Sequence, residues 1–133
     1  MKTDNWRFKI DIEKKNAVII GDSYELTDIL EIFLYKKFNV ITAIDEFDGM
    51  KKIEYFAPVC VFVKSASNVT PILAFVPKLN ARHPQNIPVI VYSKEEYSTI
   101  DEFNLKAAGV KEIIKFPIAY KDFTTVTQPY IRS

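Results

Sequence analysis

The residues of this chain that could do chemistry stand just after four short apolar runs. They are, in chain order, Gly21 and Asp22, Lys64 and Ser65, Ser93 and Lys94, and Phe116 and Pro117. A carboxylate and an ammonium group, such as those of Asp22 and Lys64, form an ion pair where the fold brings them together. A lysine can also act as a nucleophile, but only where its surroundings lower its pKa. No acid–base constellation accompanies Lys64, so an ion pair is favoured over a catalytic lysine.

The remaining metal-binding or nucleophilic side chains form no recognisable constellation. His83 is the single histidine and Cys60 the single cysteine, so the chain offers no transition-metal site. Asp45 and Asp48 lack the ligand spacing of a calcium loop. The 3 glycines form no phosphate-binding loop. We therefore expect neither a metal nor a cofactor.

Length and composition indicate a single globular domain. The chain has 133 residues, of which 48% are hydrophobic and 26% charged, with a formal net charge of +1. This balance, without a basic stripe, argues against nucleic-acid binding. No apolar run approaches the roughly 20 residues of a membrane-spanning helix. One cysteine permits no internal disulfide, which agrees with a cytoplasmic location.

Continuous apolar runs rich in β-branched residues predict strands that are buried on both faces. They cover residues 17–20, 59–63 and 89–92, then 113–114 with Phe116, and a fifth candidate covers 39–44. Segments with helical periodicity separate them, at residues 26–34, 47–56, 72–81, 95–108 and 120–131. Alternating strands and helices predict a doubly wound, flavodoxin-like α/β fold with a five-stranded parallel sheet.

Local signals within these helices predict their ends. Pro77 should kink or shorten the third helix. Gly109 should end the fourth, as a glycine just after a helix often does. Three threonines and Pro129 should weaken the fifth.

The first sixteen residues lie outside this alternation. Trp6, Phe8, Ile10 and Ile12 alternate with polar residues, a pattern typical of a half-buried strand. We expect an extra strand or arm over residues 1–16, followed by the main domain over 17–133. The arm could pack on its own domain or meet a partner or a second copy.

The residues that follow the strands resemble those of the receiver domain of bacterial response regulators (CheY-like domains), over residues 17–131. In that family the first strand ends in an acidic pair, here Gly21 and Asp22. The third ends in the phosphoacceptor aspartate, here Lys64, and the fourth in threonine or serine, here Ser93. Phe116 stands where the family has a lysine before proline, and Ala108, Gly109 and Pro117 are retained.

The departures from the family pattern imply that the phosphorylation chemistry is lost. Phosphoryl transfer depends on positioned groups and charge stabilisation, and Mg²⁺ needs several oxygen ligands. A lysine cannot form an acyl phosphate, and its charge repels a metal. We expect Lys64 to pair with Asp22 in a partly buried pocket, as a structural contact or as a lock on one conformation.

The resemblance therefore implies a pseudo-receiver that binds another protein in signal transduction and is not an enzyme. In the family the usual docking face combines the fourth helix, fifth strand and fifth helix. Here that face would draw on Tyr97, Ile100, Phe103, Lys106, Lys111 and Tyr120. The partner could be another protein or a second copy. Two alternatives stay open: a divergent receiver phosphorylated in a phosphorelay, and a flavodoxin-like domain that binds or transforms a small molecule in the same crevice.

Overall fold

Five parallel strands form one sheet in the order β2-β1-β3-β4-β5. The structure, a computed structural model, describes residues 11–22, 24–84 and 86–131. The strands are β1 (Lys15–Ile20), β2 (Phe38–Ala43), β3 (Cys60–Lys64), β4 (Val89–Ser93) and β5 (Val110–Lys115). The strand order reverses between β1 and β3, which places a crevice at the carboxyl ends of these two strands. The predicted flavodoxin-like parallel sheet is confirmed, with strand ends displaced by at most three residues.

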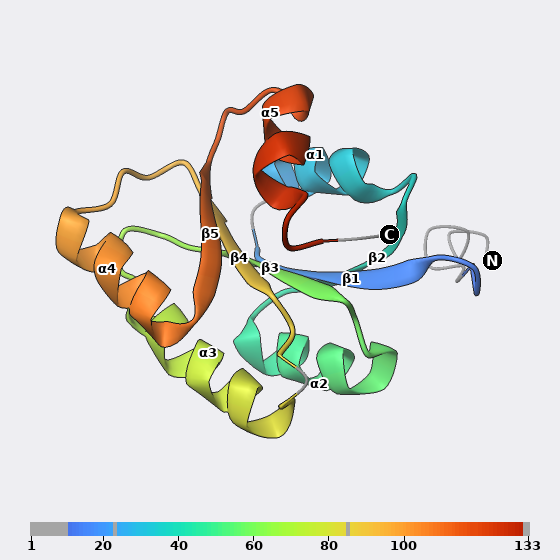
Figure 1. Cartoon of the computed structure of the whole chain (residues 1–133), viewed down its shortest axis with the longest axis horizontal. Coiled ribbons are helices and arrows are strands. Elements are labelled where there is room, and N and C mark those ends of the chain that lie inside the picture. Colours follow the sequence, from blue (N-terminus) through green and yellow to red (C-terminus); the bar gives the residue numbers. More distant parts are fainter. Residues whose placement is uncertain (1–10, 23, 85, 132–133) are drawn as a thin grey trace.

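Helices cover both faces of the sheet (Figure 1). They are α1 (Tyr24–Leu34), α2 (Glu46–Phe56), α3 (Thr70–Arg82), α4 (Thr99–Ala108) and α5 (Tyr120–Thr127). Figure 1 shows α2, α3 and α4 on one face, with α1 and α5 on the other. Among the described residues no helix has the length and apolar character needed to cross a membrane.

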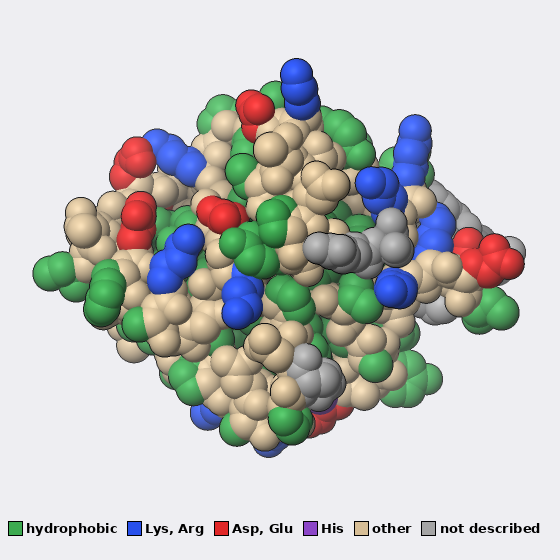
Figure 2. Space-filling model, viewed as in Figure 1, with side chains coloured by type: hydrophobic (Ala, Val, Ile, Leu, Met, Phe, Trp, Pro, Cys, Tyr) green, Lys and Arg blue, Asp and Glu red, His purple; other side chains and the backbone are tan. Residues whose placement is uncertain are grey.

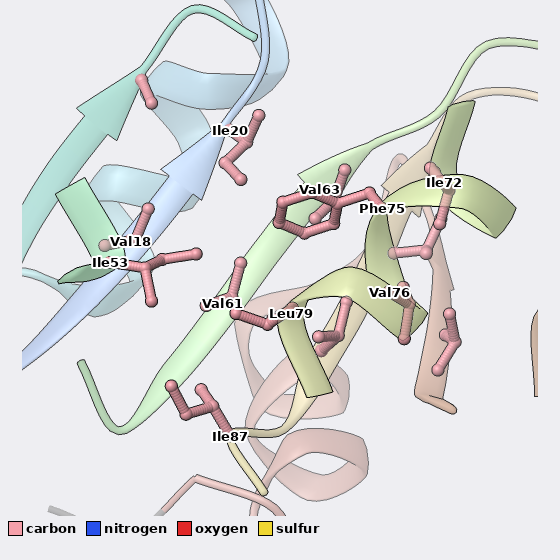
Figure 3. Packing of buried hydrophobic residues seen from close by; sticks show 14 of the residues in the cluster. Val18, Ile20, Ile53, Val61, Val63, Ile72, Phe75, Val76, Leu79 and Ile87 are labelled. Carbon is pink, nitrogen blue, oxygen red and sulfur yellow. The ribbon is translucent and has the colours of Figure 1, made fainter. Parts of the chain in front are cut away.

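The core is split by the sheet into two layers. Along β3, Val61 and Val63 point to the layer under α2, α3 and α4, whereas Cys60 and Phe62 point to the layer under α1 and α5. All four side chains are fully buried. Figure 3 shows Val61 and Val63 with residues of α2 and α3 around them. A strand buried on both faces explains why its sequence is a continuous apolar run.

Helix α2 packs on the sheet through a small residue. A Cβ atom added to Gly49 would lie 2.3 Å from Ile20 Cδ1, so the helix approaches β1 more closely than a larger residue would permit. Ile53, one turn later, is fully buried on the same side. Phe47 and Tyr55 are turned outward and are 72% and 82% exposed. The helical periodicity of this segment comes from Phe47, Met50, Ile53 and Tyr55 or Phe56. Met50, Ile53 and Phe56 do face the core, whereas the placement of Phe47 there is wrong.

Helix α3 runs through Pro77 for 13 residues, so of the two expected effects of the proline, a kink or a shorter helix, the shortening is wrong. Pro77 lies on the exposed side of the helix. The opposite side buries Phe75, Val76 and Leu79, and these apolar contacts outweigh the one backbone hydrogen bond that a proline removes.

Helix α4 begins at Thr99, four residues later than expected, because Ser98 caps it. The Ser98 Oγ accepts a hydrogen bond from the Asp101 N–H at 3.1 Å. The helix ends at Gly109, whose φ of 118° lies in the left-handed region that favours glycine. The predicted C-terminal glycine is confirmed.

Helix α5 ends at Thr127, four residues before the expected end. The Thr124 and Thr125 hydroxyls both donate to the Lys121 carbonyl, and the Thr127 hydroxyl donates to the Phe123 carbonyl. Such bonds let threonine compete with the helix ladder, which explains the short helix.

The described chain begins beside the edge strand β2. The Asp11 N–H donates to Asn39 Oδ1, and the Asn39 amide donates back to the Asp11 carbonyl, both at 2.9 Å. Farther along β2, Lys52 Nζ donates to the Thr42 carbonyl at 2.8 Å. Ile12 lies in a turn and is 93% exposed, so it does not continue a half-buried strand. Residues 1–10 of the expected arm lie outside the described residues, and Lys15 and Asn16 at its end belong to β1.

Candidate functional site

Asp22 and Lys64 meet at the carboxyl edge of the sheet, as expected. Lys64 is the last residue of β3, and its Nζ lies 3.8 Å from Asp22 Oδ1. The Lys64 side chain is 26% exposed but that of Asp22 is 84% exposed. The expectation of a partly buried carboxylate is therefore wrong, because Asp22 projects from the loop after β1 into solvent. An ion pair this exposed contributes about 0–1 kcal/mol to stability.

The space beneath Gly21 is filled by a tyrosine hydroxyl that the sequence reading did not single out. A Cβ atom added to Gly21 would lie 2.5 Å from Tyr92 Oη and 2.8 Å from Lys64 Cβ. Real Cβ atoms essentially never approach so closely. The backbone at Gly21 is also fixed, because its N–H donates to the Ala43 carbonyl at 2.9 Å. An acidic side chain at this position would have to displace Tyr92.

Tyr92 is fully buried at the penultimate position of β4. Its hydroxyl donates to the Ile20 carbonyl at 3.3 Å and lies 3.2 Å from Thr27 Oγ1. Burial raises the pKa of this hydroxyl to about 12, an effect that the hydrogen bond with Thr27 opposes and the charge of Asp22 reinforces. Tyr92 thus ties β4 to the end of β1 and to α1 through a neutral hydroxyl.

Ser93 and Phe116 do not present reactive groups to the crevice. Ser93 is 1% exposed, and its Oγ accepts a hydrogen bond from the Glu95 N–H at 2.9 Å. Phe116 is 2% exposed and stacks on Phe33, while its ring meets that of Tyr92 edge-on. The position that the resemblance compares with a lysine is therefore part of the apolar core between the sheet and α1.

The other lysines at this edge are already paired with carboxylates. Lys94 pairs with Glu25, and Lys115 pairs with Glu96 at 2.7 Å. In residues 11–22, 24–84 and 86–131, no three His, Cys, Asp or Glu side chains are grouped closely enough to hold a metal ion. Asp22, the one carboxylate at the end of β1, faces an ammonium group. The residues present therefore do not fit the Mg²⁺ ion that the resemblance to receiver domains implies.

A shallow hollow lies beside Gly21 and Asp22, between α1 and β2. Its volume is about 230 Å³, and its walls include Tyr24, Thr27 and Ile44. Ligand pockets usually measure about 300–1,000 Å³. Lys64 and Ser93 do not line this hollow. The geometry therefore gives little support to a small-molecule site centred on the crevice.

The expected docking face is only partly assembled. Ile100 and Phe103 stand one turn apart on α4 and are 71% and 70% exposed, while Leu105 alone on this helix is fully buried. Figure 2 shows hydrophobic side chains projecting from the end of the molecule where α4 lies. Lys106 is exposed and Lys111 half-buried.

The two tyrosines of the expected face lie elsewhere. Tyr97 is half-buried against the core under α4, and its hydroxyl is buried with no hydrogen-bond partner among the described residues. The Tyr120 ring packs edge-on against Phe33 of α1 at 5.3 Å. Tyr120 is 50% exposed and lines the groove between α1 and α5, whereas the exposed apolar side chains of the expected face lie on α4.

Two comparisons with known proteins give no relatives. No protein-family model matches the chain, and a search of curated proteins finds no match. Solved structures do match. The chemotaxis protein CheY4 of Vibrio cholerae aligns over 89% of this chain and 99% of its own, with a TM-score of 0.77 and 16% identity. The chain has a CheY-like receiver fold.

Further matches agree with the receiver fold at equally low identity. The receiver domain of NtrX from Brucella abortus aligns over 86% of this chain and 97% of its own, with a TM-score of 0.73 and 19% identity. Against the longer NtrX chain, the match covers 26% of that protein. A putative pilus assembly-related protein of Burkholderia pseudomallei aligns over 92% of both chains, with a TM-score of 0.75 and 13% identity. Identities this low show the fold alone.

Proposed function

We propose that this receiver-fold domain works without accepting a phosphoryl group and acts by binding another protein. The observation that carries the proposal is the state of the carboxyl edge of the sheet. Lys64 occupies the end of β3 and points toward Asp22, and the Tyr92 hydroxyl fills the space where a second acidic side chain would stand. Attack on a phosphoryl donor needs a carboxylate nucleophile and carboxylate ligands for a metal ion. At this edge a lysine stands at the end of β3, and Asp22 is the one carboxylate at the end of β1.

Phosphorylation independence is tested by mass spectrometry. The full chain is incubated with acetyl phosphate and Mg²⁺, and its intact mass is then measured. We expect no change in mass. A stoichiometric gain of about 80 Da, the mass of one phosphoryl group, would favour the alternative of a divergent receiver still phosphorylated in a phosphorelay. Loss of that mass with hydroxylamine would place the group on a carboxylate.

The proposed partner surface is the outward face of α4. Ile100 and Phe103 expose two large apolar side chains one turn apart, and Lys106 adds a cation on the same helix. Large apolar side chains in the centre of an interface commonly dominate its binding energy. The described residues leave both side chains exposed, which supports a second protein as the occupant.

Matched variants test this surface. Crosslinked capture from the native host is compared between wild type, Ile100→Ala with Phe103→Ala, and Tyr55→Ala. Tyr55 is 82% exposed on α2, away from α4, so its truncation controls for a general loss of surface area. We expect the α4 variant to lose its partner and the Tyr55 variant to retain it. Equal capture by all three proteins would contradict a role of α4 in docking.

A further inference from the structure

A second apolar surface lies between α2 and α3. The two helices leave a groove of about 300 Å³ between them. Its apolar walls are made by Phe47 and Met50 of α2 and by Pro71, Ala74 and Phe75 of α3. Phe75 is 4% exposed and forms the floor, and Figure 3 shows it reaching from α3 toward Val63. By contrast, Phe47 is 72% exposed at the rim, although the sequence pattern placed it in the core.

The groove has one closed end and one open end. Arg82 Nη1 of α3 lies 2.9 Å from Glu54 Oε2 of α2, so an ion pair joins the walls at the carboxyl ends of the helices. At the amino ends, Phe47 and Pro71 leave an apolar mouth. An occupant therefore meets apolar side chains at the mouth and charged side chains farther along.

The charges along the groove are not balanced. Lys51 and Lys78 line opposite walls, and in the part of the chain that the structure describes neither takes part in an ion pair. Lys51 Nζ instead lies 4.5 Å from the centre of the Phe47 ring. The one unpaired acid, Glu46, stands in the first turn of α2, where the helix dipole stabilises its charge. The groove lining therefore carries one positive charge in excess, with Lys51, Lys78 and Arg82 against Glu46 and Glu54.

We propose that this groove binds an amphipathic helix of a partner protein, which inserts one large apolar side chain between carboxylates. Both walls are rows of side chains spaced by helical turns, and such rows accept the ridge of a third helix. Carboxylates on that helix would meet Lys51 and Lys78. A second copy docking through the same groove would bring its own lysines against them, which disfavours a symmetric dimer here. The inference extends the proposed function, since it adds a second surface to the same interaction module.

A displayed library of amphipathic helical peptides of about 16 residues, long enough to form a marginal helix, provides the probe. The full chain is immobilised, and bound peptides are sequenced after selection. We expect enrichment of peptides with an aromatic residue or leucine flanked by Asp or Glu. Enrichment of basic or neutral peptides, or no enrichment, would overturn the proposal.

Variants then locate the surface to which the selected peptide binds. Phe47→Ala and Phe103→Ala are a matched pair, because the two side chains are 72% and 70% exposed on different helices. Fluorescence anisotropy should show affinity weakened about tenfold or more by Phe47→Ala and by less than about twofold by Phe103→Ala. The reverse order would overturn the groove while leaving the proposed α4 surface intact.

Charge reversal gives a second readout that does not depend on Phe47. Lys51→Glu with Lys78→Glu should weaken binding of the acidic peptide about tenfold or more, as desolvated charge pairs do when one partner is reversed. A peptide with its carboxylates replaced by lysine should bind this double variant better than it binds wild type. Unchanged affinity of both peptides for the double variant would overturn the proposed charge recognition.

Discussion

At the scale of single residues, the carboxyl edge of the sheet is organised around Tyr92. Its hydroxyl fixes the end of β1 through the Ile20 carbonyl and excludes any side chain at Gly21. The sequence predicted that Lys64 and Asp22 would meet, because the carboxyl ends of parallel strands lie together. It could not predict that the Tyr92 hydroxyl fills the space at Gly21, because Tyr92 stands in a continuous apolar run and looks like one more residue of a buried strand. The sequence signal for this role was the position of Tyr92 just before Ser93, near the end of the strand. Tyr92 lies on the same face of β4 as Ile90.

The close contact at Gly21 predicts a coupled stability effect. Gly21→Ala should lower the free energy of unfolding by about 1–3 kcal/mol, because the new methyl group overpacks a buried tyrosine that cannot turn away. Tyr92→Phe removes the nearest atom, so the double variant should lose less than the sum of the two single losses. Urea denaturation of the four proteins measures this coupling. Additive losses would show that the hydroxyl does not limit the space.

Alkaline pH should also destabilise the domain through Tyr92. The hydroxyl is neutral when protonated, and burial holds its native pKa at about 12, against about 10 in the unfolded chain. The native state therefore holds this proton more tightly, and the stabilisation is complete below pH 10 and lost as the pH rises toward 12. Denaturation at pH 9 and pH 11 should show a smaller loss for Tyr92→Phe than for wild type.

Two controls separate Tyr92 from other groups that titrate at alkaline pH. Burial raises the pKa of the Cys60 thiol to about 12 as well, so part of the alkaline loss should remain in Tyr92→Phe. Tyr55 is 82% exposed, and Tyr55→Phe should lose as much stability as wild type. A wild-type loss that Tyr92→Phe does not reduce would contradict the assignment.

At the scale of elements, apolar runs and helical stripes predicted all five strands and five helices, but not where the helices end or how each is rotated. The ends depend on single hydrogen bonds, such as the cap at Ser98 and the threonine bonds in α5. The rotation of α2 depends on Gly49, which brings one side of the helix onto Ile20 and turns Phe47 outward. A stripe of apolar residues in the sequence does not show which of those residues stays exposed once the helix packs on the sheet.

The cap of α4 should carry measurable stability. Ser98→Ala removes the oxygen that accepts from the Asp101 N–H, and it should lower the free energy of unfolding by about 1 kcal/mol. Ser67→Ala, in an exposed loop, provides the matched serine control and should change stability by less than about 0.5 kcal/mol. Thermal or urea denaturation of the two variants measures both losses of stability. Equal effects of the two substitutions would mean that the cap contributes nothing to α4.

At the scale of the whole molecule, the order of strands and helices predicted the doubly wound parallel sheet, because alternating elements permit few topologies. The receiver fold was predicted from the resemblance of the residues that follow the strands. The surfaces were less predictable. Tyr120 was expected on the face that α4, β5 and α5 share, and it begins α5, but its ring packs on Phe33 of α1. Sequence periodicity identifies residues that need burial, whereas it does not identify the helix against which an aromatic ring will pack.

The charges of the domain predict that Mg²⁺ does not change its thermal stability. A ligand that binds only the native state raises its melting temperature, and the stabilisation grows with the logarithm of the ligand concentration above the dissociation constant. With Asp22 facing Lys64, MgCl₂ at about 10 mM should shift the melting temperature by no more than NaCl of equal ionic strength does. A clear additional rise in MgCl₂ would reveal a metal site that the described side chains do not provide.

A hydrogen bond on the outer side of β2 bears on aggregation at high protein concentration. A free sheet edge can act as a template onto which strands of other molecules add, the first step of fibril growth. Here Lys52 Nζ already donates to the Thr42 carbonyl. An incoming strand would have to break this bond and desolvate the lysine before it could extend the sheet. Concentrated solutions should therefore resist assembly through β2. Lys52→Ala would remove the ammonium group that occupies the Thr42 carbonyl and should weaken this resistance.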